Sequence, residues 1–230
     1  MKIENGVLSN VTICDIVNGT LEIPNNVTSI GAVAFEWCEN LLSIEIPNSV
    51  TNIGFSAFRG CINLQSVIIP ESVKFIQAFA FNQCRRLQAI VIPHGVTVID
   101  THTFGGCYSL QSVEIPDSVT TIGDNAFSLC YNLQSIEIPK SVITIGDRAF
   151  CHCESLQSVS FPDSVTKMGK LVFSDCYKLK SVVLPKTINQ IKLGFFDSCN
   201  DLTDVTVSKK CKFDIRAFRG CTNLRHVHEI

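Results

Sequence analysis

The eight prolines of this chain recur at a fixed interval of 23 positions. They stand at Pro24, Pro47, Pro70, Pro93, Pro116, Pro139, Pro162 and Pro185. A fixed period between about 20 and 50 residues indicates a solenoid, in which one short unit stacks on the next. Phenylalanine, cysteine and leucine keep the same interval, in columns that run from Phe35 to Phe196, Cys38 to Cys199 and Leu41 to Leu202. The sequence therefore predicts one continuous repeat domain over residues 1–230.

The repeat pattern divides this domain into three parts. Residues 1–20 precede the first unit and are expected to form an N-terminal lead-in or cap, and residues 21–207 carry the regular 23-residue repeats. After Pro185 the pattern decays, because Ser208 takes the proline position and the frame resumes one residue early at Phe218. An atypical last unit is expected at the end of a repeat array. We therefore assign residues 208–230 to a C-terminal capping repeat.

The first half of each unit has the pattern of a half-buried strand. In residues 110–132, polar Ser112 and Glu114 alternate with apolar Val113 and Ile115, and this period of two is typical of a strand with one buried face. Pro116 lacks an N–H group and ends the strand. Stacked units are expected to place these strands in a parallel sheet.

The second half of each unit has the spacing of a helix. Ile122, Ala126 and Cys130 lie four positions apart, and Phe127 lies three positions before Cys130. This spacing predicts about two turns of helix or 3₁₀ helix. The inward-facing phenylalanine column is expected to bury the most apolar surface, about 1.5–3 kcal/mol for each ring fully removed from water.

The complete unit resembles a known repeat. Its pattern, Leu-x-x-Ile/Val-x-Ile-Pro-x-Ser-Val-Thr-x-Ile-Gly-x-x-Ala-Phe-x-x-Cys-x-x-Leu, is similar to the BspA-type leucine-rich repeat over about residues 21–224. The resemblance implies an α/β solenoid: a right-handed superhelix with a parallel concave sheet and short helices or 3₁₀ turns on the convex side. It also implies a non-enzymatic module that binds a protein ligand through its concave face, most commonly as a microbial adhesin or host-interaction protein. The alternative is an intracellular scaffold or effector that recognises a cytosolic protein.

Charge and hydropathy narrow the set of partners. The formal net charge of −2 and the pI near 6.2 give no electrostatic reason to expect nucleic acid or an anionic membrane. No apolar run approaches the length of a membrane span or of a signal peptide. We therefore expect no membrane insertion. The same observation predicts that the chain is cytoplasmic or is exported by a non-classical route. The family resemblance implies instead that it lies on the cell surface or is secreted. The oligomeric state stays open.

The twelve cysteines allow three interpretations. Nine of them share the repeating column, the eight from Cys38 to Cys199 and Cys221 in the last unit. We expect these to be buried, reduced and packed beside a neighbouring backbone carbonyl. For a metal site, Cys151-His152-Cys153 leaves only two free ligands, whereas His226 and His228 face the same side of the last strand and could take up a metal weakly. No histidine recurs beside the cysteine column as a nucleophile would require. We therefore expect no enzyme activity, no cofactor and no dedicated metal site.

Two outward-facing strand columns vary from unit to unit, and function is expected where the repeats differ. One column is small, with serine or alanine from Ser43 to Ser181. The other is varied, and its first five members form the predicted concave binding site: Glu45, Ile68, Val91, Glu114 and Glu137. An apolar centre inside a charged rim is typical of protein interfaces. The open alternative is that Ile68 and Val91 merely favour a strand.

A second candidate surface lies on the early convex turns. Trp37, Phe55, Phe75 and Phe79 occupy columns that are otherwise polar or small. Exposed aromatic residues beside arginines are typical of interface hot spots. These four residues are the predicted alternative site, either for a partner or for a second copy of the chain, unless local packing absorbs them.

Overall fold

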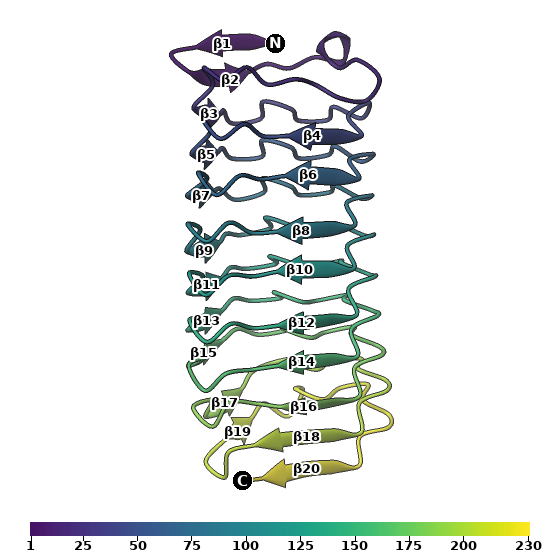
Figure 1. Ribbon diagram of the computed structural model, residues 1–230. Helices are drawn as coiled ribbons and strands as arrows, with labels where there is room; N and C mark the ends of the chain where they lie inside the picture. Colours follow the sequence, from purple (N-terminus) through teal and green to yellow (C-terminus); the bar gives the residue numbers. More distant parts are fainter.

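The computed structural model describes residues 1–230 as one stack of short coils (Figure 1). The N-terminus lies at one end of the stack and the C-terminus at the other. Two ladders of short parallel strands run along the stack, and each coil contributes one strand to each ladder. Irregular turns close each coil on the remaining sides.

The first ladder contains the strands that the sequence predicts. Each strand begins two residues after the column leucine and ends before the column proline, as in β10, which covers Ser112–Glu114. Within the groups β4–β6, β8–β10, β12–β14 and β16–β18–β20 the strands pair in parallel and in register. Residues 23 positions apart therefore become neighbours, as in β4 and β6, whereas β18 and β20 pair residues 22 positions apart. Its members are β4 (Ser43–Glu45), β6 (Ser66–Ile68), β8 (Ala89–Val91), β10 (Ser112–Glu114), β12 (Ser135–Glu137), β14 (Ser158–Ser160), β16 (Ser181–Val183), β18 (Asp204–Val207) and β20 (His226–Glu229). We call the outward surface of these strands the strand face.

The second ladder follows the proline turn. All of its strands except the last, β19, end on a buried apolar residue, such as Ile122 in β11, which faces the same core. The members are β3 (Ser29–Ile30), β5 (Asn52–Ile53), β7 (Phe75–Ile76), β9 (Val98–Ile99), β11 (Thr121–Ile122), β13 (Thr144–Ile145), β15 (Lys167–Met168), β17 (Gln190–Ile191) and β19 (Lys212–Phe213). Together the two ladders and the turns enclose one apolar column.

The N-terminal residues extend this second ladder. Strands β1 (Lys2–Glu4) and β2 (Val7–Ser9) form an antiparallel hairpin, and β2 pairs in parallel with β3. A 3₁₀ turn, η1 (Ile13–Asp15), follows, with the Thr12 N–H donating to the Asp15 carboxylate at 2.8 Å. Leu8 is fully buried. The lead-in therefore covers the apolar end of the first coil.

The helices predicted for the convex side are not present, because η1 is the only helix in residues 1–230. The segment with helical spacing instead contains two positions per coil with positive φ, such as His102 (φ 54°) and Gly106 (φ 77°), which a right-handed helix excludes. These two N–H groups donate to the carbonyls of Asp124 and Ser128 in the next coil, at 2.9 and 2.7 Å, whereas the Gly105 N–H donates back to His102 at 3.1 Å. Coil-to-coil hydrogen bonds therefore replace the internal bonds of a helix.

The core is built on the phenylalanine column. Its rings from Phe35 to Phe196 are fully buried, and neighbouring rings are stacked, as for Phe127, whose centroid lies 5.5 Å from Phe104 and 5.7 Å from Phe150. Stacking of aromatic rings adds to the burial of their apolar surface. One row of rings therefore joins the coils along the stack.

Candidate functional site

The predicted concave residues form one continuous row on the strand face. Glu45 pairs with Ile68 across β4 and β6, and Val91 pairs with Glu114 across β8 and β10. Glu137 follows on β12, the next coil. All five side chains are exposed, with exposed fractions of 60% for Ile68 and 53% for Val91. The structure therefore brings the five residues together, with two apolar residues between acidic ones.

The strand face beside this row is lined by small side chains. The adjacent outward column holds Ser66, Ala89 and Ser112 at the level of the apolar pair. Small side chains leave the backbone of the sheet accessible, so a partner can approach Ile68 and Val91 closely. Because the platform is held by in-register strands, binding there requires little ordering of the backbone.

Two depressions lie along the edge of the row, where the strand face meets the proline turns. One is lined by Glu45 and Ile68 together with Pro47 and Pro70. The other, further along the stack, is lined by Glu114, Glu137 and the prolines Pro116 and Pro139. The row is therefore flanked by two separate hollows, and Val91 lies between them.

The three carboxylates of the row have no ionic partner within the chain. Glu45, Glu114 and Glu137 form no ion pair, although the chain has ion pairs elsewhere. A surface with uncompensated negative charge favours a partner with basic groups.

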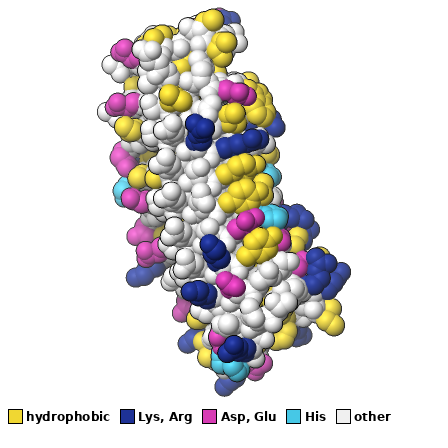
Figure 2. Space-filling model, turned by 90° about the vertical axis from the view of Figure 1, so that its right-hand side faces the viewer, with side chains coloured by type: hydrophobic (Ala, Val, Ile, Leu, Met, Phe, Trp, Pro, Cys, Tyr) yellow, Lys and Arg dark blue, Asp and Glu magenta, His cyan; other side chains and the backbone are white.

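The predicted convex aromatic residues do not form one patch. The Trp37 ring lies over Gly60, and the guanidinium of Arg59 sits 5.5 Å from the Trp37 ring centroid while it also pairs with Glu36 at 3.2 Å. Figure 2 shows basic side chains next to hydrophobic ones on this side of the stack. Trp37 therefore takes part in a local cluster that covers a coil-to-coil contact.

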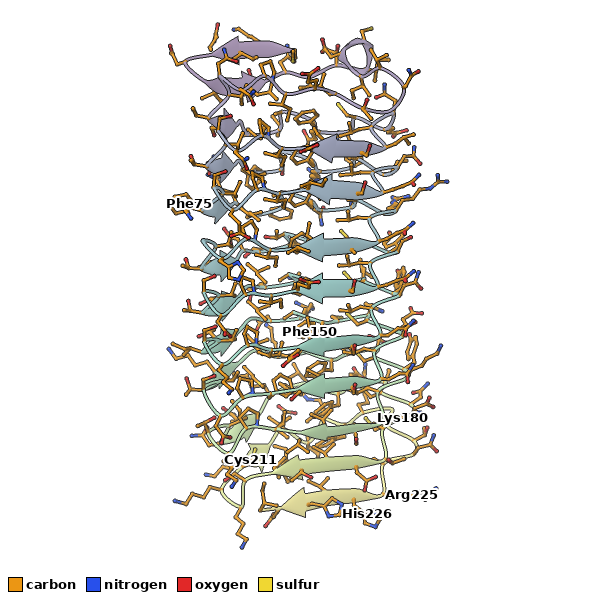
Figure 3. All side chains as sticks on the ribbon, in the orientation of Figure 1. Phe75, Phe150, Lys180, Cys211, Arg225 and His226 are labelled. Carbon is orange, nitrogen blue, oxygen red and sulfur yellow. The ribbon has the colours of Figure 1, made fainter.

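The remaining convex residues separate into two places. Phe55 and the half-buried Phe79 meet edge to face at 5.5 Å, and Phe79 stacks on His102 at 4.8 Å. Phe75 instead projects from β7 at the edge of the stack, with 65% of its surface exposed (Figure 3). These contacts leave the strand-face row as the more continuous candidate.

Two clusters of metal-ligating side chains occur outside the row. Cys151 and His152 approach Asp175, and His226 and His228 approach Asp204. The sequence pointed to the two histidine-containing segments but missed both aspartates. Asp175 lies one coil after His152, at the equivalent position, and Asp204 lies one coil before His226, one residue from the equivalent position. The 23-residue column is therefore the signal that could have identified both aspartates.

The column cysteines are structural. The eight column cysteines from Cys38 to Cys199 are buried, and each thiol donates to a backbone carbonyl of the coil before it, as the sequence predicts. All twelve cysteines of the chain are free. Burial raises the pKa of the Cys107 thiol to about 12 and that of Cys151 to about 11. Protonated, buried thiols are poor nucleophiles.

Coils of 23 residues, each with one strand in the first ladder and an inward leucine and cysteine, define a leucine-rich-repeat solenoid. The sequence matches the BspA type leucine rich repeat region over residues 3–134 and 120–228, and the chain belongs to this family. No helix of the structure combines the length and the apolar character that crossing a membrane requires. None of the curated proteins matches the sequence.

Solved structures of bacterial proteins share the fold. A leucine-rich repeat protein from Bacteroides ovatus is 35% identical over 90% of this chain, with a TM-score of 0.85, and this chain covers 54% of its length. A leucine rich cell surface protein from Faecalibacterium prausnitzii is 26% identical over 91% of this chain, with a TM-score of 0.57 and 78% of its own length covered. A leucine rich repeat protein of T. pallidum is 26% identical over 90% of this chain, with a TM-score of 0.51 and 78% of its length covered. Leucine-rich repeat proteins generally mediate protein–protein interactions.

Proposed function

We propose that this chain is a non-enzymatic module that binds a protein ligand on the strand face, centred on Ile68 and Val91. The observation that carries the proposal is the exposure of these two apolar residues on consecutive coils. Exposed aliphatic residues on a rigid sheet, surrounded by small and acidic residues, have the composition of an interface core and its rim. The unpaired Glu45, Glu114 and Glu137 favour a partner that places basic groups around an apolar contact.

The proposed setting is the surface of a microbe, where the module would act as an adhesin or host-interaction protein. The similar protein from Faecalibacterium prausnitzii is described as a cell surface protein, and this likeness supports the same setting here. The interaction would then be with a protein of the host matrix or of another cell.

Binding to purified extracellular matrix proteins and to intact host cells tests the proposal. Fluorescently labelled wild-type chain should bind at least one of these surfaces saturably. Ile68→Asp with Val91→Asp should weaken that binding at least tenfold, because two carboxylates would be placed at the centre of the contact. Circular dichroism and thermal midpoint should stay unchanged, since both side chains face solvent.

Phe75→Asp is the matched control, because Phe75 is similarly exposed but projects from β7. It should bind as the wild type does. Retained binding by the double variant would exclude the strand face, and loss of binding in Phe55→Asp with Phe79→Asp would then place the contact on the convex turns. Absence of wild-type binding to every matrix protein and cell would contradict the adhesin role.

A further inference from the structure

Three side chains with metal-binding chemistry converge on the strand face of the last two coils. The Nδ1 atom of His226 lies 3.2 Å from Oδ1 of Asp204, and the Nε2 atom of His228 lies 3.3 Å from the same oxygen. His226 is labelled on β20 in Figure 3. Two imidazoles on one strand therefore direct nitrogen atoms at one carboxylate on the neighbouring strand.

The parallel register explains this convergence. Asp204 of β18 pairs with His226 of β20, and His228 lies two residues further along the same strand. Because side chains alternate between faces, all three point outward, while Val205 and Val207 are buried on the opposite face. The two imidazole rings stack, with centroids 5.4 Å apart and an interplanar angle of 25°. The arrangement is thus fixed by the sheet rather than by a flexible loop.

The spacing of the three ligand atoms suits a transition metal. With metal–ligand bonds of about 2.0–2.1 Å, a tetrahedral zinc site separates its ligand atoms by about 3.3 Å. The two oxygen–nitrogen distances match this value, and all three ligand atoms lie within 4.8 Å of one another. Imidazole nitrogen with one carboxylate favours zinc, nickel or copper over magnesium and calcium.

We propose that Asp204, His226 and His228 bind one divalent transition-metal cation, with zinc as the expected ion. The side chains are accessible, since the histidines have exposed fractions of 61% and 52%. The open side of the site faces solvent, so water completes the coordination. The site lies at the opposite end of the strand face from Glu45 and does not depend on the proposed function.

The second cluster is a weaker candidate because its aspartate is engaged elsewhere. Asp175 accepts hydrogen bonds from the Ser174 hydroxyl at 2.7 Å and from the Tyr177 hydroxyl at 3.4 Å. Its distance to Nε2 of His152 is 3.6 Å, and the third member, Cys151, is buried. This cluster provides an internal comparison for the test.

Titration of tag-free protein with Zn²⁺, Ni²⁺ and Co²⁺ tests the proposal by calorimetry and visible absorption. We expect one equivalent per chain and Co²⁺ bands of a nitrogen- and oxygen-ligated ion. His228→Asn and Asp204→Asn should each weaken binding about tenfold or more. Zn²⁺ should raise the thermal midpoint of the wild type but not of either variant, since a ligand stabilises only the state that binds it.

Two further variants locate the ion. His94→Asn is the matched control, because His94 is an exposed histidine that pairs with a single carboxylate, Glu71, at 3.3 Å; its metal affinity should equal that of the wild type. Unchanged affinity in the His228 and Asp204 variants, or no binding by the wild type, would overturn the proposal. Thiolate-to-cobalt bands that vanish in Cys151→Ala would assign the ion to the other cluster and overturn it equally.

Discussion

The thiol of Cys107 donates a hydrogen bond to the carbonyl oxygen of Phe81, 3.3 Å away in the preceding coil. The bond recurs along the stack, in the pairs Cys61–Phe35, Cys84–Phe58, Cys130–Phe104, Cys153–Phe127, Cys176–Phe150, Cys199–Phe173 and Cys221–Phe196. Each of these carbonyls also accepts a backbone N–H within its own coil, as Phe81 does from Cys84 at 3.2 Å, so the thiol supplies a second donor to a buried oxygen with two lone pairs. Cysteine fits this position because it is small, apolar and able to donate one weak hydrogen bond.

The buried thiols predict that the fold loses stability at alkaline pH. Burial raises the pKa of the Cys107 thiol from 9.0 to about 12, so the unfolded chain loses this proton at a lower pH than the folded chain. The stabilisation is complete below about pH 9 and is lost as the pH rises toward 12, by about 1.4 kcal/mol per pH unit for each such thiol. Urea unfolding with a reductant present, at several values between about pH 8 and 11, measures this slope.

Cys107→Ala isolates the contribution of one thiol to that slope. The variant should be less stable at pH 8, because the Phe81 carbonyl keeps the Cys84 N–H but loses the thiol as its second donor, and because the smaller side chain leaves a gap in the core. Its stability should fall less steeply above about pH 9. If the free energy of unfolding fell with pH at the same rate in the wild type and the variant, Cys107 would ionise alike in the folded and unfolded chains, and the prediction would be wrong.

Phe127→Ala should destabilise the stack strongly. The Phe127 ring is fully buried between Phe104 and Phe150, and removing a buried phenylalanine costs about 3–5 kcal/mol. For a chain of this size we expect the thermal midpoint to fall by roughly 10 °C. Phe75→Ala, at an exposed ring, should change the stability by less than about 0.5 kcal/mol. Equal effects of the two substitutions would mean that the columns are assigned in the wrong register.

Gly60→Ala should destabilise for two separable reasons. Gly60 has a φ of 72°, and a Cβ atom there would overlap the Trp37 ring. The backbone conformation alone disfavours alanine by about 1–2 kcal/mol. Gly106 has a φ of 77°, but the atom nearest to an added Cβ there is 3.3 Å away. Gly106→Ala therefore measures mainly the loss of stability caused by the backbone conformation. Adding Trp37→Ala to Gly60→Ala should reduce the loss to the Gly106→Ala value, as a double-mutant cycle by urea unfolding would measure. If the effects of Gly60→Ala and Trp37→Ala on the free energy of unfolding were strictly additive, the proposed clash between the new Cβ atom and the Trp37 ring would be wrong.

Val33→Asn should stabilise the protein. Val33 is a β-branched residue with a φ of 53°, in the same column as Asn125 with a φ of 54°. Asparagine tolerates this conformation better than valine, by about 1 kcal/mol, and 47% of the Val33 surface is already exposed. Val98→Asn, at an exposed position in β9, has no positive φ to relieve and should be neutral or destabilising. A lower urea midpoint for Val33→Asn would show that side-chain packing outweighs the backbone strain.

Much of the candidate site follows from the sequence because side-chain direction in a strand has a period of two. Once Pro47 and Pro70 mark the ends of two strands, Glu45 and Ile68 must share the outward face, and the register of β4 and β6 places them side by side. The convex set could not be predicted in the same way. Phe75 and Phe79 are close in sequence but fall on different sides of a bend.

The 23-residue period of the sequence is enough to predict the strands of the first ladder and the residues that face the core, because it leaves each column only one environment. The period does not predict the strands of the second ladder. The hydrogen bonds of the convex backbone depend on how the coils stack. The helical spacing of Ile122, Ala126 and Phe127 shows which side chains must point into the core. Turns with alternating backbone conformations place these side chains in the core as well as a helix does. Backbone donors such as the His102 N–H bind carbonyls in the next coil. These hydrogen bonds join residues far apart in the sequence, so no local sequence pattern predicts them. The meeting of Asp204 with His226 and His228 arises in the same way, from the register between two coils.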